Sequence, residues 1–277
     1  MKALLTGANG MLGRDVMAAL ADRITLLPYP KEALDIADPR AVARVIEAEA
    51  PDLVINCAAY TDVDGCESQW ETAVMVNALG PRNLAVAADR VGAALVHVST
   101  DYVFDGTASA PYTEFDPVAP ATAYGRSKLA GEEAVRTHCR RHYILRTAWL
   151  YGEHGGNFVH TMLKLARERE RLSVVDDQVG NPTWTRDVAR VIGELADTGA
   201  YGTYHATARG ECSWHGFARA ILKEKGIDTP VDAVTSDAFP RPAKRPAYSG
   251  LANLCLSALG IEMGSWERSL KAYLERM

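Results

Sequence analysis

Short apolar runs of strand length alternate with helix-periodic segments through the first half of the chain, and this alternation constrains the fold more than any other feature. The apolar runs are the segments 3–6, 24–27, 53–57, 95–99 and 143–147. Helical patterns lie between them, at 14–21, 39–49, 74–91 and 123–137. Strands connected by helices are typical of a parallel sheet, because each connection must cross over the sheet. The pattern therefore predicts an α/β fold built on a doubly wound parallel sheet with right-handed crossovers.

The alternation loosens after Trp149, which predicts a second and smaller part of the molecule. A proline-rich stretch at 240–246 breaks the pattern further. We therefore expect residues 1–148 to form a nucleotide-binding domain and residues 149–277 a smaller mixed α/β substrate lobe. The segments near 172–198 are expected to return to the first domain. A chain of 277 residues with 48% hydrophobic content is long enough for both parts.

Composition excludes several classes of function. The net charge of −5 offers no overall basic surface, so nucleic acid is not expected as a partner. The five cysteines are scattered, with no Cys-x-x-Cys and no metal-ligand spacing, which favours a reduced cytoplasmic protein with no metal site. We find no signal peptide and no apolar run of the roughly 20 residues needed to span a membrane, so no membrane partner is expected.

The first apolar run leads directly into a glycine turn. Gly7, Gly10 and Gly13 are spaced Gly-x-x-Gly-x-x-Gly before an apolar helical segment. Glycines allow a tight turn and a close approach of the backbone to a pyrophosphate, which binds the unpaired N–H groups of a helix N-terminus. Glycines also mark ordinary turns, but the position straight after a strand favours a dinucleotide site.

Tyr124 and Lys128 stand four residues apart in a predicted helix, which brings the two side chains together on one face. A free tyrosine titrates near pH ~10, and a nearby lysine charge favours the phenolate and lowers that pKa. The pair therefore predicts a general acid that works at neutral pH, although the same spacing occurs in helices without a catalytic role.

Hydroxyl side chains end the fourth apolar run, at Ser99 and Thr100. The carboxyl end of a strand is where open α/β sheets bind ligands. Thr100 is therefore a candidate to hydrogen-bond a carbonyl oxygen that Tyr124 protonates. Capping of the strand end is the alternative role for both hydroxyls.

A series of motifs resembles the extended short-chain dehydrogenase/reductases, and among them the dTDP-4-dehydrorhamnose reductase family. The motifs follow the family order over nearly the whole chain, at 6–13, 56–64, 99–104, 124–131, 146–149, 157–158, 177–183 and 245–246. The string Ser-Thr-Asp-Tyr-Val-Phe at 99–104 separates this branch from other sugar-nucleotide enzymes. The resemblance implies reduction of the C4 ketone of dTDP-4-dehydro-L-rhamnose to dTDP-L-rhamnose by hydride transfer from a reduced nicotinamide.

The resemblance also implies roles for individual residues. Tyr124 would donate the proton, Lys128 would bind the nicotinamide ribose, and Thr100 would orient the ketone. Asn77 would complete a proton relay, with an ordinary surface hydrogen bond as its alternative. The implied cofactor contacts are Gly7, Gly10, Met11, Leu12, Gly13, Asp35, Ile36, Ala58, Ala59, Tyr60, Tyr124 and Lys128. The implied substrate contacts are Thr100, Asp101, Tyr102, Trp149, Asn157, Arg241 and Arg245.

Some of these substrate residues suit their roles chemically. Trp149 offers a flat apolar face to a deoxysugar, and the planar forks of Arg241 and Arg245 suit a diphosphate. Core packing for the tryptophan and a surface loop for the arginines are the alternatives.

The segment after the second strand bears on the choice of cofactor. An NAD-specific site usually places an acid there, about 20 residues after the glycine turn, and here the chain reads Pro-Tyr-Pro-Lys-Glu at 28–32. No acid stands at the strand end, and Lys31 could attract a 2′-phosphate. We predict use of both cofactors with NADPH preferred. Lys31 as a solvated side chain, or Glu32 as the ribose acceptor, remain the alternatives.

One position departs from the family pattern. Arg186 stands where some members have an acidic magnesium ligand at a dimer interface, although Asp15 retains an acid at another such position. A guanidinium cannot bind a cation, so no metal is expected, and the chain is expected to be a monomer or a homodimer. A 4-keto reductase for another nucleotide-linked deoxysugar is one alternative function. A non-catalytic regulatory subunit, resembling that of methionine adenosyltransferase, is the other.

Overall fold

Six parallel strands form the central sheet of the computed structural model, which describes residues 1–277. Their order across the sheet is β10-β5-β4-β3-β1-β2, and every neighbouring pair is parallel. The strands are β1 (Lys2–Thr6), β2 (Thr25–Tyr29), β3 (Leu53–Asn56), β4 (Ala94–Thr100), β5 (His142–Thr147) and β10 (Gly202–His205). The predicted parallel α/β sheet is therefore confirmed. The strand order reverses between β1 and β3, and such a switch point opens a crevice at the carboxyl ends of the strands.

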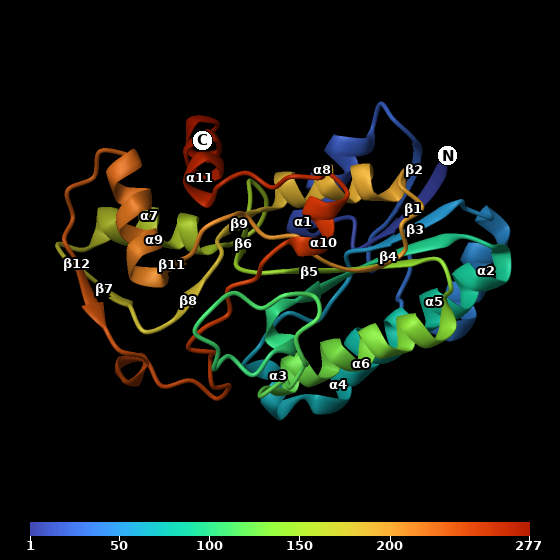
Figure 1. Ribbon diagram of the computed structural model, residues 1–277, viewed down its shortest axis with the longest axis horizontal. Coiled ribbons are helices and arrows are strands. Elements are labelled where there is room, and N and C mark those ends of the chain that lie inside the picture. The colour runs from blue at the N-terminus through green and yellow to red at the C-terminus, as the bar shows by residue number, and fades with distance from the viewer.

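Helices cover both faces of this sheet (Figure 1). One face carries α1 (Met11–Leu20) and α8 (Thr185–Ala196), and the other carries α2 (Pro39–Glu49), α5 (Gly80–Val91) and α6 (Ala123–His138). A separate buried core fills each side. Because the central strands are buried on both faces, they need apolar side chains in both directions, which explains their continuous apolar runs.

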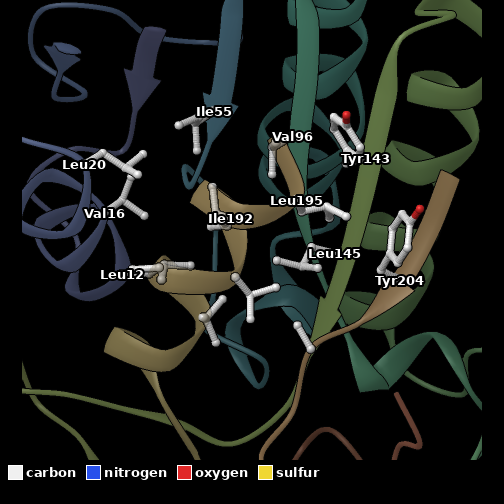
Figure 2. Close-up of a cluster of buried hydrophobic side chains, with 14 of the residues drawn as sticks. Leu12, Val16, Leu20, Ile55, Val96, Tyr143, Leu145, Ile192, Leu195 and Tyr204 are labelled. Atoms are coloured by element: carbon white, nitrogen blue, oxygen red, sulfur yellow. The ribbon is translucent and has the colours of Figure 1, made fainter. Parts of the chain in front are cut away.

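The core under α1 extends directly to the glycine turn. Figure 2 shows Leu12, Val16 and Leu20 of α1 in a buried hydrophobic cluster that also contains Ile192 of α8. Leu12 lies in the first turn of the helix, right after the glycines. Packing of this helix therefore fixes where its N-terminus points.

A smaller lobe lies beside the carboxyl ends of the main strands (Figure 1). Its helices are α7 (Phe158–Glu168), α9 (Trp214–Glu224) and α11 (Trp266–Glu275), which share a third buried core. Its strands form three pairs, which are β6 (Leu150–Tyr151) with β9 (Thr183–Trp184), β8 (Val179–Gly180) with β11 (Cys212–Ser213), and β7 (Leu172–Val175) with β12 (Val231–Val234).

Only one of the two segments predicted to return to the first domain packs there. The helix α8 packs on α1 and shares its core. The strand β7, which we also expected to return, pairs with β12 in the smaller lobe instead. Conversely, β10 joins the main sheet beside β5, which the sequence did not suggest. A four-residue apolar run does not specify its partner strand, because that partner is distant in sequence.

The remaining elements are short. They are α3 (Gly65–Ser68), α4 (Trp70–Val74), a π-helical turn (Met75–Leu79), two 3₁₀ turns (Asp101–Val103 and Ser236–Ala238) and α10 (Leu254–Ala258). None of the helices combines the length and the apolar character that crossing a bilayer would require.

Candidate active site

A cavity of about 480 Å³ lies at the carboxyl ends of the central strands. It brings together many of the residues that the sequence predicted for the site, which are Gly10, Met11, Leu12, Gly13, Ala59, Thr100, Asp101, Tyr102, Tyr124, Lys128 and Trp149. These residues come from the glycine turn, from three strand ends and from α6, so the fold alone assembles them.

The glycine turn fits a bound pyrophosphate. Gly7 has a φ of +69°, and a Cβ on it would lie 2.6 Å from the backbone nitrogen of Ala58. A Cβ on Gly13 would lie 2.3 Å from the carbonyl oxygen of Gly7. The cap of α1 at Gly10 makes no side-chain hydrogen bond, which leaves the N–H groups of the first helical turn free for an anion.

The start of α6 packs directly on the backbone of the segment that follows β4. The helix begins after Thr122, whose hydroxyl accepts a hydrogen bond from the Gly125 N–H at 3.1 Å. A Cβ on Gly125 would lie 2.1 Å from the carbonyl oxygen of Tyr102. Lys128 is 2% exposed, and its Nζ donates to the carbonyl oxygen of Val98 at 2.7 Å.

The predicted lowering of the pKa of Tyr124 is wrong. Burial raises this pKa, and the neighbouring Asp101 carboxylate raises it further. Burial also lowers the pKa of Lys128 to about 8, against the opposing charge of Glu132. Removing the phenolate from water thus outweighs any help from the ammonium, which bonds a carbonyl oxygen instead. Tyr124 is therefore fully protonated at neutral pH, as a proton donor must be.

Thr100 and Asp101 form a hydrogen-bonded pair beside the phenol. The Thr100 hydroxyl donates to Oδ1 of Asp101 at 2.8 Å, and the Tyr102 N–H donates to the Thr100 hydroxyl oxygen at 3.2 Å. The neighbouring Thr100 hydroxyl lowers the pKa of Tyr124, against the larger effect of burial. Asp101 is 4% exposed, and burial raises its pKa to about 6. The hydroxyl, the carboxyl and the Tyr124 phenol therefore line the same cavity.

Asn77 lies in the π-helical turn and is fully buried. Its Oδ1 accepts from the Tyr60 N–H at 2.8 Å, and its Nδ2 donates to the Tyr60 carbonyl oxygen at 2.9 Å and to the Ser127 hydroxyl at 3.0 Å. The side chain thus ties the loop after β3 to α6. It makes no hydrogen bond to Tyr124 or Lys128, and its role in a proton relay stays a prediction.

A second cavity, of about 820 Å³, adjoins the first at Tyr102 and contains Arg241 and Arg245. Both arginines face the carboxylate of Asp64, from Arg245 Nη2 at 2.9 Å and from Arg241 Nη1 at 3.6 Å. Asp64 also accepts from the Ala243 N–H at 3.2 Å. Asp64 ends the motif at 56–64, and the sequence alone indicates no role for it. These contacts connect the segment with both arginines to the start of α3.

Several predicted residues lie outside both cavities. Asn157 caps α7 by accepting from the His160 N–H at 3.1 Å, and its amide donates to Gly152. Other predicted cofactor residues also lie away from the cavities, which are Gly7, Lys31, Asp35, Ile36, Ala58 and Tyr60. Asp35 accepts from the Ala37 N–H at 2.9 Å, and Ile36 is buried beside Gly80. Their contact with a cofactor stays a prediction.

Asp15 and Arg186, the positions that the resemblance linked to a metal site in some members, make other contacts. The Thr185 hydroxyl donates to the buried Asp15 carboxylate. The Arg186 guanidinium lies 5.7 Å from the ring centroid of Trp184. No group of three or more His, Cys, Asp or Glu side chains in the structure could hold a metal ion.

Trp214 is a cavity residue that sequence reasoning missed. Its ring stacks on Trp149, so one face of the indole that we expected to meet a sugar is covered by another indole. A tryptophan at the start of a helix carries no sequence signal of its partner, which is 65 positions away in the printed numbering. Only the fold reveals this contact.

A parallel sheet with a glycine turn at its switch point and a Thr-Tyr-Lys set beside it defines a short-chain dehydrogenase/reductase. The particular family follows from comparison with known proteins. The model of the RmlD substrate binding domain family matches residues 1–277, and the chain belongs to this family. The predicted resemblance to dTDP-4-dehydrorhamnose reductases is thereby confirmed.

Individual relatives are similar to this chain over nearly its whole length. A dTDP-4-dehydrorhamnose reductase of Mycobacterium tuberculosis strain H37Rv is 45% identical, covering 98% of this chain and 91% of that protein. The crystal structure of a dTDP-4-dehydrorhamnose reductase from Clostridium acetobutylicum has a TM-score of 0.98 at 49% identity, covering 100% of this chain and 99% of that one. The same enzyme from Bacillus anthracis, in complex with NADP, has a TM-score of 0.98 at 41% identity and the same coverage.

Proposed function

We propose that this chain is an NAD(P)H-dependent oxidoreductase that reduces the C4 ketone of dTDP-4-dehydro-L-rhamnose to form dTDP-L-rhamnose. The observation that carries the proposal is the single cavity that Thr100, Tyr124 and Lys128 share with the glycine turn. The names of the relatives and the NADP held by the Bacillus anthracis enzyme support the same reaction.

The glycine turn and Lys128 would bind the cofactor, which supplies the hydride. The free N–H groups at the start of α1 would bind its pyrophosphate. Lys128 has three ammonium protons and donates one to Val98, so two remain for the ribose hydroxyls. The Lys128 amine has to be protonated for this role. Its pKa of about 8 keeps most of it protonated at neutral pH.

Tyr124 would donate its proton to the ketone oxygen as negative charge develops there. Its raised pKa keeps the phenol protonated before the reaction and makes the proton available only to a strong base such as an alkoxide. Thr100 has a single hydroxyl proton, which it gives to Asp101 in this structure. Thr100 would orient the ketone by turning that proton from Asp101 to the substrate oxygen.

The second cavity would hold the nucleotide part of the substrate. Arg241 and Arg245 would bind the diphosphate, because a guanidinium can donate to two phosphate oxygens at once. Asp64 pairs with both arginines and holds them beside Tyr102, where the two cavities meet. The sugar would then extend from this point to Thr100 and Tyr124.

The reaction can be tested with purified protein and a small panel of dTDP-4-keto-6-deoxysugars, by following NADPH oxidation. We expect turnover with dTDP-4-dehydro-L-rhamnose. Tyr124→Phe should lower this turnover by ~10²-fold or more, the range for loss of a general acid, with NADPH affinity nearly unchanged. No oxidation with any sugar of the panel would refute the function. Near-wild-type turnover of Tyr124→Phe would refute only the assignment of the acid.

A further inference from the structure

Two tryptophans from distant parts of the chain lie face to face in the wall of the cavity that contains Tyr124. The rings of Trp149 and Trp214 have centroids 3.5 Å apart and planes 4° apart. Trp149 follows β5, at the carboxyl edge of the main sheet, whereas Trp214 is the first residue of α9 in the smaller lobe. Both side chains line the cavity. The stack therefore connects the two parts of the molecule where the sugar would bind.

Trp149 has a backbone conformation that needs support from its surroundings. Its φ is +47°, and Ala50 is the only other non-glycine residue with a positive φ. The left-handed region is unfavourable for a bulky L-residue, because the Cβ approaches the following carbonyl oxygen. Such conformations persist only where neighbouring groups hold them, and they concentrate at ligand sites.

Neighbouring groups confine the Trp149 indole. A Cβ on Gly180 would lie 2.6 Å from Cε2 of Trp149, so only a glycine leaves room for the ring there. Trp214 covers one ring face, and it is held in turn by Phe158, whose ring centroid lies 4.5 Å from its own. The residues that precede Trp149 belong to β5, in the main sheet. Its stacking partner, in contrast, belongs to α9 in the smaller lobe.

We propose that Trp214 is a positioning residue for the sugar substrate, which holds the Trp149 indole at the cavity wall so that Trp149 contacts the sugar. This inference rests on the proposed function. Because the stack already orders Trp149, substrate binding does not have to restrict that side chain, which favours affinity. Trp214 acts through Trp149, so its effect depends on the presence of that indole.

A double-mutant cycle tests this dependence. We compare Trp149→Ala, Trp214→Ala and the double variant with wild type, using dTDP-4-dehydro-L-rhamnose and NADPH. Trp214→Ala should raise the KM for the sugar nucleotide up to roughly tenfold, the fold-change equivalent of a strong aromatic pair. The KM for NADPH should stay within about twofold of wild type. In the Trp149→Ala background, Trp214→Ala should have no further effect, because the effects of coupled residues are not additive.

Two measurements separate positioning from general loss of structure. Stacked indoles couple in circular dichroism, so the exciton signal should disappear equally in Trp149→Ala and Trp214→Ala. Trp214→Phe keeps an aromatic ring against Trp149 and should restore most of the affinity for the sugar nucleotide, even if Trp214→Ala folds poorly. Trp70→Ala removes an exposed tryptophan outside both cavities and should change neither the KM values nor the exciton signal.

Several results would overturn the proposal. Additive increases in KM in the double variant would mean that Trp214 acts independently of Trp149. An unchanged KM for the sugar nucleotide in Trp214→Ala would also exclude the positioning role. So would an equal loss of affinity for the sugar nucleotide and for NADPH. A wild-type protein that turns over no dTDP-4-keto sugar would overturn the proposed function and this inference together, whereas the other results leave the proposed function intact.

Discussion

At the scale of single residues, the Asp101 carboxyl combines deep burial with incomplete hydrogen bonding. This carboxyl is 4% exposed, receives a hydrogen bond from Thr100, and has a second oxygen without a hydrogen-bond partner. Burial raises its pKa from 3.8 to about 6. Between these two pH values the folded protein holds a proton that the unfolded chain has released. Stability therefore falls as pH rises through this window.

We expect Asp101→Asn to stabilise the protein more at pH 8 than at pH 4. At pH 8 the wild-type protein keeps a buried charge on Asp101. The raised pKa of Asp101 corresponds to a cost of about 2–3 kcal/mol in the free energy of unfolding, and the uncharged amide of the variant removes this cost. At pH 4 the wild-type carboxyl is already protonated in the folded state, so little difference remains. The measurement is the free energy of unfolding in urea at both pH values.

Asp116→Asn provides a control of opposite sign. The Thr113 N–H and hydroxyl hold the pKa of the Asp116 carboxyl below its usual value, so this group contributes stability that is present at high pH and is lost on acidification. Asp116→Asn should therefore cost stability at pH 8. An equal gain in the free energy of unfolding of Asp101→Asn at both pH values would contradict the conclusion that burial raises the pKa of Asp101.

The sequence predicts which residues of the site lie together better than it predicts their pKa values. The pairing of Tyr124 with Lys128 follows from helix geometry, which is local, and the structure places both in one cavity. The direction of the Tyr124 pKa depends on burial and on Asp101, which come from elsewhere in the fold. No spacing rule contains that information, so the predicted direction was wrong.

At the scale of elements, the turn between β1 and α1 combines packing with binding. Leu12 and Val16 hold α1 in the core, and Gly13 lies where a Cβ would come within 2.3 Å of the Gly7 carbonyl oxygen. Two backbone segments therefore touch with no side chain between them. This contact keeps the free N–H groups of the helix at the cavity.

Gly13→Ala should weaken cofactor binding by tenfold or more, because the turn has to shift to admit the methyl group, and tenfold corresponds to only about 1.4 kcal/mol. The Kd for NADPH, measured by fluorescence titration, checks this expectation. Gly156→Ala is a matched control, since a Cβ there meets nothing within 4 Å. An NADPH affinity of Gly13→Ala equal to that of the control would exclude the turn as the pyrophosphate site.

The elements differ in how far the sequence predicts them. The five strands and three of the four helices predicted from the apolar runs and helical patterns agree with the observed bounds within a few residues. The fourth helix, expected at 74–91, is divided, because a π-helical turn at Met75–Leu79 precedes α5. The smaller lobe is built from pairs of two to four residues, such as β8 with β11, which are too short for a periodic signal. Their partners, like the stack of Trp149 on Trp214, are set by contacts between segments distant in sequence.

At the scale of the whole molecule, one binding region extends across both parts. The glycine turn and Tyr124 lie in the first cavity, and Arg241 and Arg245 lie in the second, which adjoins it at Tyr102. Asp64 connects the arginine segment to the start of α3. The cofactor and the sugar nucleotide would therefore meet at Thr100 and Tyr124 from opposite ends of one continuous site.

The choice between NADPH and NADH depends on the edge of the sheet, beyond the first cavity. The chain leaves β2 through Pro30 and Lys31, and no acid stands at the strand end to repel a 2′-phosphate. Lys31 is exposed, so its charge is available to a ligand there.

We predict that kcat/KM is higher with NADPH than with NADH, and that Lys31→Ala narrows the difference by weakening only the reaction with NADPH. Lys164→Ala, which removes an exposed lysine from α7 in the smaller lobe, should leave the ratio unchanged. Glu32 follows Lys31 directly and could reverse the result by binding the ribose 2′-hydroxyl. A preference for NADH of tenfold or more, about 1.4 kcal/mol in transition-state binding, would contradict the prediction and point to Glu32 as the ribose acceptor.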